Sequence, residues 1–590
     1  LFLQNSAFTT PQLRQRSEVF KNLIMDDKID EILVSDFVKK SSTVHTRLKR
    51  QFNFQDRINK KADEHANTND YGKALSSLLK VDKKLDPDIL LNSLKESLPD
   101  RVFTNLSNDE REKLYTRVDS NIAASLVNEK ILESRLRKIK RNRSPGADGL
   151  SIENLISILF NGSSQKNLKD QIIKEYVIFL KKFLTGDLSS HQNKVFYSLK
   201  LIGIPKNLDE CRIIMITGLH SKIAFSLVTS SKRKKIIENK LLKYQYGAKR
   251  SGSESVIHII QQILIQNPDY DLFSADAVKA FYKLNRDIAL ETLKSSFPEV
   301  FNMFMEKYNN SADAFVYGTA QGVLKFQQTE GGSPGSPEMS FLYELGISSF
   351  INNIADLLRS NDQSHTDKGT IAGFIDDFYW AAPFPKMIEI IQFVQRNGPK
   401  YGYTLNMQKC TYLMAPSNTF TENELAHRLD VITQLGIPIS NVKVHPNNQQ
   451  NISLELYNSR LNQWGFKVLG AYVGTTEYIE NSLNTKMHNI NEVADILLKY
   501  PNTQARYNIH RYCFNEKINY WLRTQFPQDC KKFLASFKKT QTTLIASYHG
   551  IYDRQTINDQ LPALNDLYTR VSFPIANGGL ALRCIDSVFL

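Results

Sequence analysis

Cysteine is scarce in this chain, and its spacing suggests neither a crosslink nor a metal. Five cysteines (Cys211, Cys410, Cys513, Cys530 and Cys584) are widely separated, with no Cys-x-x-Cys pair and no Cys/His cluster at zinc spacing. A disulfide framework and a structural zinc are therefore both disfavoured, and a reducing compartment fits this pattern.

Long hydrophobic runs are also missing. No apolar stretch reaches membrane-spanning length, so we expect no membrane partner. The opening Leu1–Asn5 is too short and uncharged for a signal peptide. No short-period repeat or low-complexity tract is present, which disfavours a solenoid. Because the first residue is not Met, we expect an incomplete reading frame or a processed chain.

The composition is that of a multidomain globular protein with a basic balance. The length of 590 residues predicts two to four domains. Hydrophobic residues at 41% and aromatic residues at 10% are sufficient for packed cores. Lysine and arginine number 75 against 61 acidic residues, a net charge of +14 that favours a polyanionic partner, with nucleic acid the leading candidate.

Two adjacent carboxylates, Asp376 and Asp377, lie inside the apolar run 370–383. A buried pair of like charges implies a bound metal ion or a strongly shifted pKa of one carboxyl group. The β-branched and aromatic neighbours, with Gly373 and Pro383, predict a hairpin that presents both carboxylates at its tip. A solvated turn is the alternative when the pair is considered alone.

Other segments supply a third carboxylate and basic groups. Asp276 lies where the sequence changes from strand to helix, the position at which open α/β sheets hold ligands. Lys206, Arg212 and Lys222 surround a short β-element and could grip a triphosphate, although an ordinary strand with basic side chains is as consistent with these residues alone. A basic helix end at 135–143 leads into the turn 144–149, which could lie against a phosphate backbone.

Two further features complete the pattern. The Gly/Pro-dense loop Glu330–Glu338 allows close backbone approach to a ligand, or merely begins the apolar helix expected over 341–354. From about residue 480 the apolar period becomes helical, which predicts a helical C-terminal domain.

In their order, these stretches resemble the reverse transcriptases of non-LTR (LINE-type) retrotransposons over roughly residues 115–585. Asp276 with Ala280-Phe281 resembles the first palm motif, and Phe374–Asp377 resembles the Phe/Tyr-x-Asp-Asp hairpin. The resemblance implies that Phe281 excludes a 2′-hydroxyl. The remaining similar segments are Ser144–Gly149 (fingers), Ile204–Lys206 with Arg212 (triphosphate), Leu405-Asn406 with Lys409, and Leu469-Gly470 (primer grip).

One position departs from the family pattern. The family's loop usually reads Gln-Gly-Asp-Pro, whereas this chain reads Pro334-Gly335-Ser336-Pro337. Gly335 is kept as a substrate-binding residue by the resemblance, and the missing glutamine concerns activity and fidelity rather than fold.

The resemblance implies an α+β right-hand polymerase with fingers, palm and thumb. It divides the chain into a mostly helical N-terminal extension (1–115), fingers and palm (116–460), and a helical primer grip, thumb and post-thumb region (461–590). It implies an RNA-directed DNA polymerase that takes an RNA template, a DNA primer and deoxynucleoside triphosphates, and that acts in the nucleus.

For the reaction, Asp276 and Asp376 are expected to hold two Mg²⁺ ions, which Mn²⁺ can replace, with Asp377 as a third ligand or a support of the hairpin. Lys206 and Arg212 would neutralise the triphosphate, and Lys409 is a candidate general acid. A decayed or domesticated copy that binds RNA without polymerising is the main alternative. An RNA-dependent RNA polymerase or a telomerase-like enzyme, which shares the palm, is a third, and Phe281 argues against the use of ribonucleotides.

Overall fold

The computed structural model describes residues 54–79, 87–98, 107–118, 121–139, 141, 143–161, 166–206, 210–238, 243–319, 322–359, 369–416, 420–445, 464–548, 571–575 and 580–582. The first 53 residues of the expected N-terminal extension and much of the tail after Tyr548 lie outside these ranges. In the ranges described, no helix is long and apolar enough to cross a membrane.

The fold is of the α+β class and forms two compact units that do not follow chain order. Among described residues, the first unit comprises Lys84–Gly252 and Ser274–Cys410. The second comprises Lys49–Lys83, Ser253–Phe273 and Thr411–Leu590. The three-part division expected from the sequence stays a prediction about polymerase subdomains.

The first unit contains a sheet of order β2-β1-β4-β5. Its strands are β1 (Leu199–Pro205), β2 (Cys211–Thr217), β4 (Ala312–Thr319) and β5 (Gly322–Gln328). Along β2, buried residues alternate with more exposed ones, as expected for a strand with one face on a core. Helix α5 (Pro87–Ser97) covers that core through Leu94. The antiparallel β1–β2 pairing places Ile204 opposite Arg212, so the small β-element predicted between Lys206 and Arg212 is present.

A second sheet carries the carboxylate hairpin. In the first unit its order is β6-β7-β3, where β6 is Thr370–Phe374, β7 is Asp377–Ala382 and β3 is Asp271–Ala275. The first three residues of β3 belong to the second unit, where the order is β3-β8-β9, with β8 at Thr411–Leu413 and β9 at Val442–Lys443.

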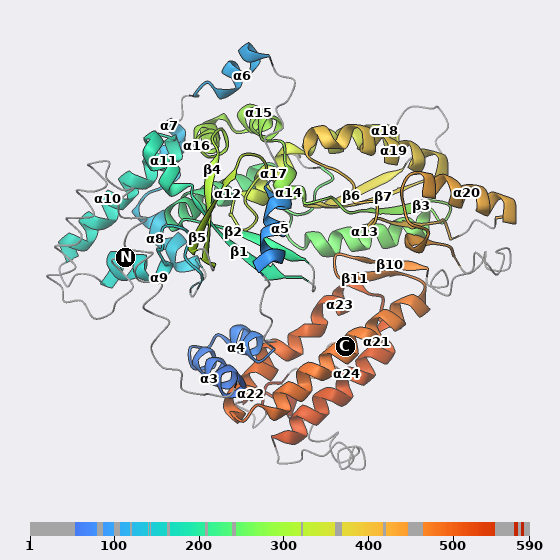
Figure 1. Ribbon diagram of the computed structural model, residues 1–590. Helices are drawn as coiled ribbons and strands as arrows, with labels where there is room; N and C mark the ends of the chain where they lie inside the picture. Colours follow the sequence, from blue (N-terminus) through green and yellow to red (C-terminus); the bar gives the residue numbers. More distant parts are fainter. Residues whose placement is uncertain are drawn as a thin grey trace. The chain divides into compact units, whose positions relative to one another are not determined.

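Helices α18 (Ser348–Arg359) and α19 (Phe384–Asn397) pack against β6 and β7 (Figure 1). The apolar segment expected as one helix over 341–354 is instead α17 (Met339–Gly346) followed by α18. The break falls beside Gly346, on which a Cβ would lie 2.8 Å from Leu284 Cδ1, so the chain is closely packed there.

The first unit contains further helices. They are α6 (Asn108–Tyr115), α7 (Asn121–Ala124), α8 (Glu129–Lys138), α9 (Ile152–Ile156), the π-helix η2 (Ser157–Asn161), α10 (Lys166–Thr185), α11 (Ser190–Phe196), α12 (Leu219–Glu238), α14 (Ala280–Lys283), α15 (Arg286–Ser296), α16 (Pro298–Tyr308) and the 3-10 helix η3 (Gly398–Tyr401).

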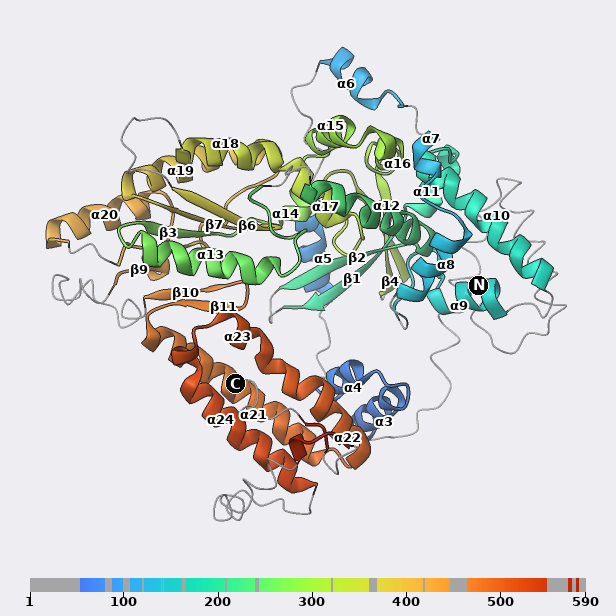
Figure 2. The same cartoon turned by 180° about the vertical axis from the view of Figure 1, so that it is seen from behind.

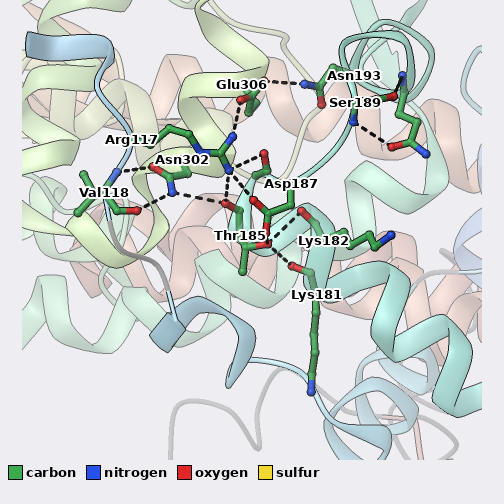
Figure 3. Close-up of polar contacts among 12 residues, drawn as sticks. Arg117, Val118, Lys181, Lys182, Thr185, Asp187, Ser189, Asn193, Asn302 and Glu306 are labelled. Atoms are coloured by element: carbon green, nitrogen blue, oxygen red, sulfur yellow. Dashed lines mark hydrogen bonds and ion pairs between the residues drawn. The ribbon is translucent and has the colours of Figure 1, made fainter.

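Polar side chains tie distant segments of the first unit together (Figure 3). Arg117 donates to the carbonyl oxygens of Thr185 (3.1 Å) and Gly186 (2.9 Å), and pairs with Asp187 at 2.7 Å. The buried amide of Asn302 holds the backbone of Val118 at both ends: Val118 N–H donates to Oδ1 (2.9 Å) and Nδ2 donates to Val118 O (2.7 Å). These bonds give backbone groups of Val118, Thr185 and Gly186 side-chain partners.

The second unit is mostly helical. Its helices are α3 (Phe54–Asn67), α4 (Tyr71–Leu78), α13 (Gly252–Gln266), α20 (Glu422–Gln434), η4 (Ile439–Asn441), α21 (Thr476–Lys499), α22 (Thr503–Ile509), η6 (His510–Phe514), η7 (Asn515–Ile518), α23 (Asn519–Thr524) and α24 (Pro527–Ser547).

A single core joins its two ends in sequence. Helices α3 and α4 pack against α22 (Figure 2). Ala62, Leu75 and Leu78 share one core with α21 and α24. Beside this core, the strands β10 (Gly465–Val468) and β11 (Ala471–Gly474) pair antiparallel. The helical C-terminal region expected from about residue 480 is confirmed.

Candidate active site

The tip of the β6–β7 hairpin carries two carboxylates on a strained turn. Phe374 pairs with Asp377, so Ile375 and Asp376 are the two residues of the connection. Ile375 has φ +61°, a region that two-residue hairpins ordinarily fill with Gly, Asn or Asp and that is unfavourable for a β-branched residue. The hairpin and its carboxylate tip, both predicted from the sequence, are present.

The third carboxylate, Asp276, directly follows β3. Its backbone carbonyl accepts a hydrogen bond from Asn406 N–H at 2.8 Å, and Val278 N–H donates to Thr404 O at 2.8 Å. The segment 404–406 therefore runs beside 276–278. Lys409 follows this segment and lies close enough to Asp276 for its positive charge to lower the pKa of that carboxyl group.

The three carboxyl groups share one electrostatic field. Burial raises the pKa of Asp377 to about 7, and the negative charges of Asp376 and Asp276 add to this effect. Burial, followed by the charge of Asp276, also raises the pKa of Asp376, whereas a backbone hydrogen bond and the charge of Arg212 lower it. For Asp276, burial raises the pKa while Lys409 and Lys206 lower it. Clustered carboxylates that resist ionisation are a common feature of catalytic sites.

The raised pKa of Asp377 predicts that the stability of the chain depends on pH. Because the pKa of Asp377 is raised in the folded chain, folding takes up a proton and the free energy of unfolding falls as pH rises from about 4 to about 7. Asp377→Asn should therefore stabilise the chain more at pH 8 than at pH 5, measured by urea unfolding without divalent ions. An equal gain at both pH values would contradict the shared field.

The basic hairpin contributes Lys206 and Arg212. Lys206 Nζ pairs with Glu210 Oε2 at 2.8 Å, and this bond is the largest cause of the raised pKa of Lys206. Both side chains are about half exposed, so the pair is weak and a phosphate can compete for the lysine. Arg212 is exposed. Lys206 is close enough to Asp276 to lower the pKa of that carboxyl group, and Arg212 does the same for Asp376. Lys222 is placed elsewhere, beside Arg143 in a cavity of about 170 Å³ near the start of α12.

The Gly/Pro loop packs directly against the segment of Phe281. Gly332 N–H donates to Phe281 O at 2.7 Å, and a Cβ on Gly331, which has φ +65°, would lie 1.9 Å from Tyr282 O. Only glycine fits there. Farther along, Met215 N–H on β2 donates to Pro334 O at 3.0 Å, and Gly335 has φ +106°. The loop thus lies between Phe281 and the basic hairpin.

Sequence reasoning missed two residues of this site, Tyr343 and Gln245. The ring of Tyr343 packs edge-on against Phe281 at 5.2 Å, and burial together with the charges of Asp376 and Asp377 raises its pKa well above the usual value. The side-chain amide of Gln245 forms hydrogen bonds with the backbone of Ile375 in the strained turn. A buried tyrosine on an apolar helix and a glutamine in a loop carry no local signal of either role.

The donor set suits a hard divalent cation that substrate phosphates help to hold. Within the described part of the chain, no three His, Cys, Asp or Glu side chains form a ligand group by themselves. Asp276, Asp376 and Asp377 offer only oxygen atoms, and their mutual repulsion would be relieved by positive charge. Mg²⁺ is characteristically bound by one or two carboxylates plus substrate phosphates, so these residues fit it.

Comparisons with known proteins give a distant structural similarity. No family model and no curated protein matches the chain. A solved structure of apo telomerase from Candida tropicalis has a TM-score of 0.32 and 12% identity, covering 95% of this chain and 99% of that one. A version truncated from the C-terminal domain has a TM-score of 0.29 and 14% identity, covering 63% and 92%. Similarity at this level does not show what the chain does.

Proposed function

We propose that the chain is an RNA-directed DNA polymerase of a non-LTR retrotransposon that acts in the nucleus. The observation that supports this most is the common field of Asp276, Asp376 and Asp377, which come from two segments one hundred positions apart. The retrotransposon origin and the nuclear location rest on the order of the sequence motifs.

The carboxylates would bind the metal ions and the basic hairpin would bind the triphosphate. Asp276 and Asp376 would hold two Mg²⁺ ions, with Asp377 at their side. When bound, such ions favour ionisation of the primer 3′-hydroxyl and stabilise charge on the departing pyrophosphate. Arg212 and Lys206 would orient the triphosphate, for which the lysine exchanges Glu210 for phosphate oxygens. Lys409, whose charge acts on Asp276, would protonate the pyrophosphate.

The nucleic acid would be bound mainly through its backbone. The net charge of +14 favours contacts with phosphates that do not depend on base sequence, and such binding weakens steeply with salt.

Primer extension tests the proposal. Purified full-length chain should elongate oligo(dT) on poly(rA) with dTTP and Mg²⁺ or Mn²⁺. Normal binding of this template-primer without elongation would instead favour a nonpolymerising RNA-binding protein, for which Pro334 in the loop is the specific observation.

Phe281 gives a prediction about sugar selection. Its ring is held against Tyr343 and its backbone against Gly332, so a 2′-hydroxyl on an incoming nucleotide would meet a fixed side chain. Phe281→Val should raise the ratio of kcat/KM for UTP to that for dTTP by about tenfold to a hundredfold.

Phe393→Val is the matched control. Phe393 is also half-buried and packs against another ring, that of Phe350 at 6.1 Å, but it lies on α19. The control should leave the ratio unchanged. If Phe281→Val leaves it unchanged as well, Phe281 is not the gate.

A further inference from the structure

We infer that Gln245 is a positioning residue that holds the strained Ile375–Asp376 turn and thereby fixes the carboxylate of Asp376. The contacts that fix the turn do not depend on the chemistry, whereas their effect on catalysis rests on the proposed function. Four hydrogen bonds and one packing contact from the loop 244–247 carry the inference.

The side chain of Gln245 bonds both ends of the strained residue. Ile375 N–H donates to Gln245 Oε1 at 2.9 Å, and Gln245 Nε2 donates to Ile375 O at 2.6 Å. Gln245 is only 2% exposed, so water does not compete freely for these bonds. Its amide therefore replaces, for this one residue, the two ladder bonds that a neighbouring strand would supply.

The backbone on either side of Gln245 continues the same hold. Gly373 N–H donates to Tyr244 O, and Tyr246 N–H donates to Gly373 O, both at 2.8 Å. Gln245 and Gly373 thus form a parallel bridge along the outer edge of β6. The loop is hydrogen-bonded both to strand β6 and to the turn that follows it, so it fixes the position of the turn relative to the strand.

Packing leaves the turn little freedom to relax. A Cβ on Gly247 would lie 2.6 Å from Ile375 Cγ1 and 2.3 Å from Glu344 Oε1. The Ile375 side chain therefore rests against bare backbone. A residue kept at φ +61° persists only where its surroundings over-determine it, and here those surroundings are the glutamine amide and the glycine.

The consequence concerns Asp376, the next residue along the chain. If the turn relaxed, the peptide between Ile375 and Asp376 would rotate, and the carboxylate would move relative to Asp276. Displacements of about 1 Å at a reacting centre cost roughly a hundredfold in rate. Gln245 does not touch the reacting atoms, so its effect should fall on the rate of the chemical step and not on substrate binding.

The test uses the full-length chain and the variant Gln245→Met, which keeps the side-chain length and removes both bonds. Single-turnover extension of oligo(dT) on poly(rA) should slow by about tenfold to a hundredfold. KM for dTTP and the Kd for template-primer should change less than about twofold, because no substrate contact is lost. Amide hydrogen exchange in the peptide 370–383 should quicken.

Asn302→Leu is the matched control. Asn302 makes the same two-ended amide bond to the backbone of Val118 and is equally buried at 2% (Figure 3). This variant should quicken exchange around Val118 and leave extension unchanged. Gln245→Leu, which also removes both bonds and adds no charge, covers the case in which the methionine variant does not fold, and it should slow extension by about tenfold or more.

The outcomes separate the inference from the proposed function. Unchanged exchange in 370–383, or extension within about twofold of wild type, would overturn the inference. An equal loss of extension in Asn302→Leu would also overturn it, by showing general destabilisation. If the wild-type chain extends no primer at all, the proposed function fails, and the exchange measurement still decides whether Gln245 holds the turn.

Discussion

Replacing Asp376 by asparagine is expected to reduce single-turnover primer extension about a thousandfold while template-primer binding stays within about twofold. The size follows from the several kcal/mol that a bound metal ion contributes to a phosphoryl transition state, at about 1.4 kcal/mol per tenfold. The fold should persist, because the substitution removes a charge that burial and Asp276 already disfavour. Extension is measured by rapid quench, and binding by fluorescence anisotropy of a labelled primer.

Asp313→Asn is the control for this experiment. Asp313 is also a largely buried carboxylate of the first unit, but its charge is paired with Lys325 at 2.9 Å on the β4–β5 strands. Its loss should not alter extension. Wild-type extension rates for Asp376→Asn would show that the hairpin carboxylate does no chemistry.

The second large effect is on stability, at the buried ion pair of Lys307 and Glu338. Both side chains are at most 2% exposed, and Glu338 Oε1 also accepts a hydrogen bond from Tyr308 OH at 3.0 Å. The pair links α16 to the end of the Gly/Pro loop. Burial lowers the pKa of Lys307, against the opposing effect of Glu338. Lys307→Met should cost about 3–5 kcal/mol in the free energy of unfolding, because it leaves an uncompensated buried carboxylate.

A double variant separates charge from packing. Lys307→Met combined with Glu338→Gln should regain much of that loss, since it removes the uncompensated buried charge and keeps an acceptor for Tyr308 OH. Lys325→Met, which breaks the half-exposed pair with Asp313, should cost less than about 1 kcal/mol. Urea unfolding at pH 7 measures all three. A Lys307→Met variant as stable as wild type would mean that the pair contributes nothing.

The sequence could predict the parts of the site whose signals are local. Two carboxylates in an apolar run, an acid at the end of a strand and a short basic hairpin each carry their own pattern, and β6, β7, β3, β1 and β2 form where those patterns predicted them. Lys222 is close to the basic hairpin in the sequence, but the structure places it at a separate cavity, so the prediction that it belongs with Lys206 and Arg212 is wrong.

What could not be predicted depends on contacts between distant residues. Gln245 meets Ile375 across 130 positions, and no composition rule selects that glutamine from others in the chain. The left-handed conformation of Ile375 is also hidden, because propensity assigns that conformation to glycine. Likewise, the choice of α22 as the partner of α3 and α4 is set by tertiary packing.

The central claim is that these carboxylates form a working polymerase centre, and one measurement tests it most directly. Wild-type chain is bound to a saturating oligo(dT)·poly(rA) template-primer and given dTTP and Mg²⁺, and the fraction of bound primer lengthened by one nucleotide is followed in a single turnover. The account predicts that most of the bound primer is extended, and that omitting the metal stops the reaction. Primer that stays bound and unextended with Mg²⁺ and with Mn²⁺ would contradict it.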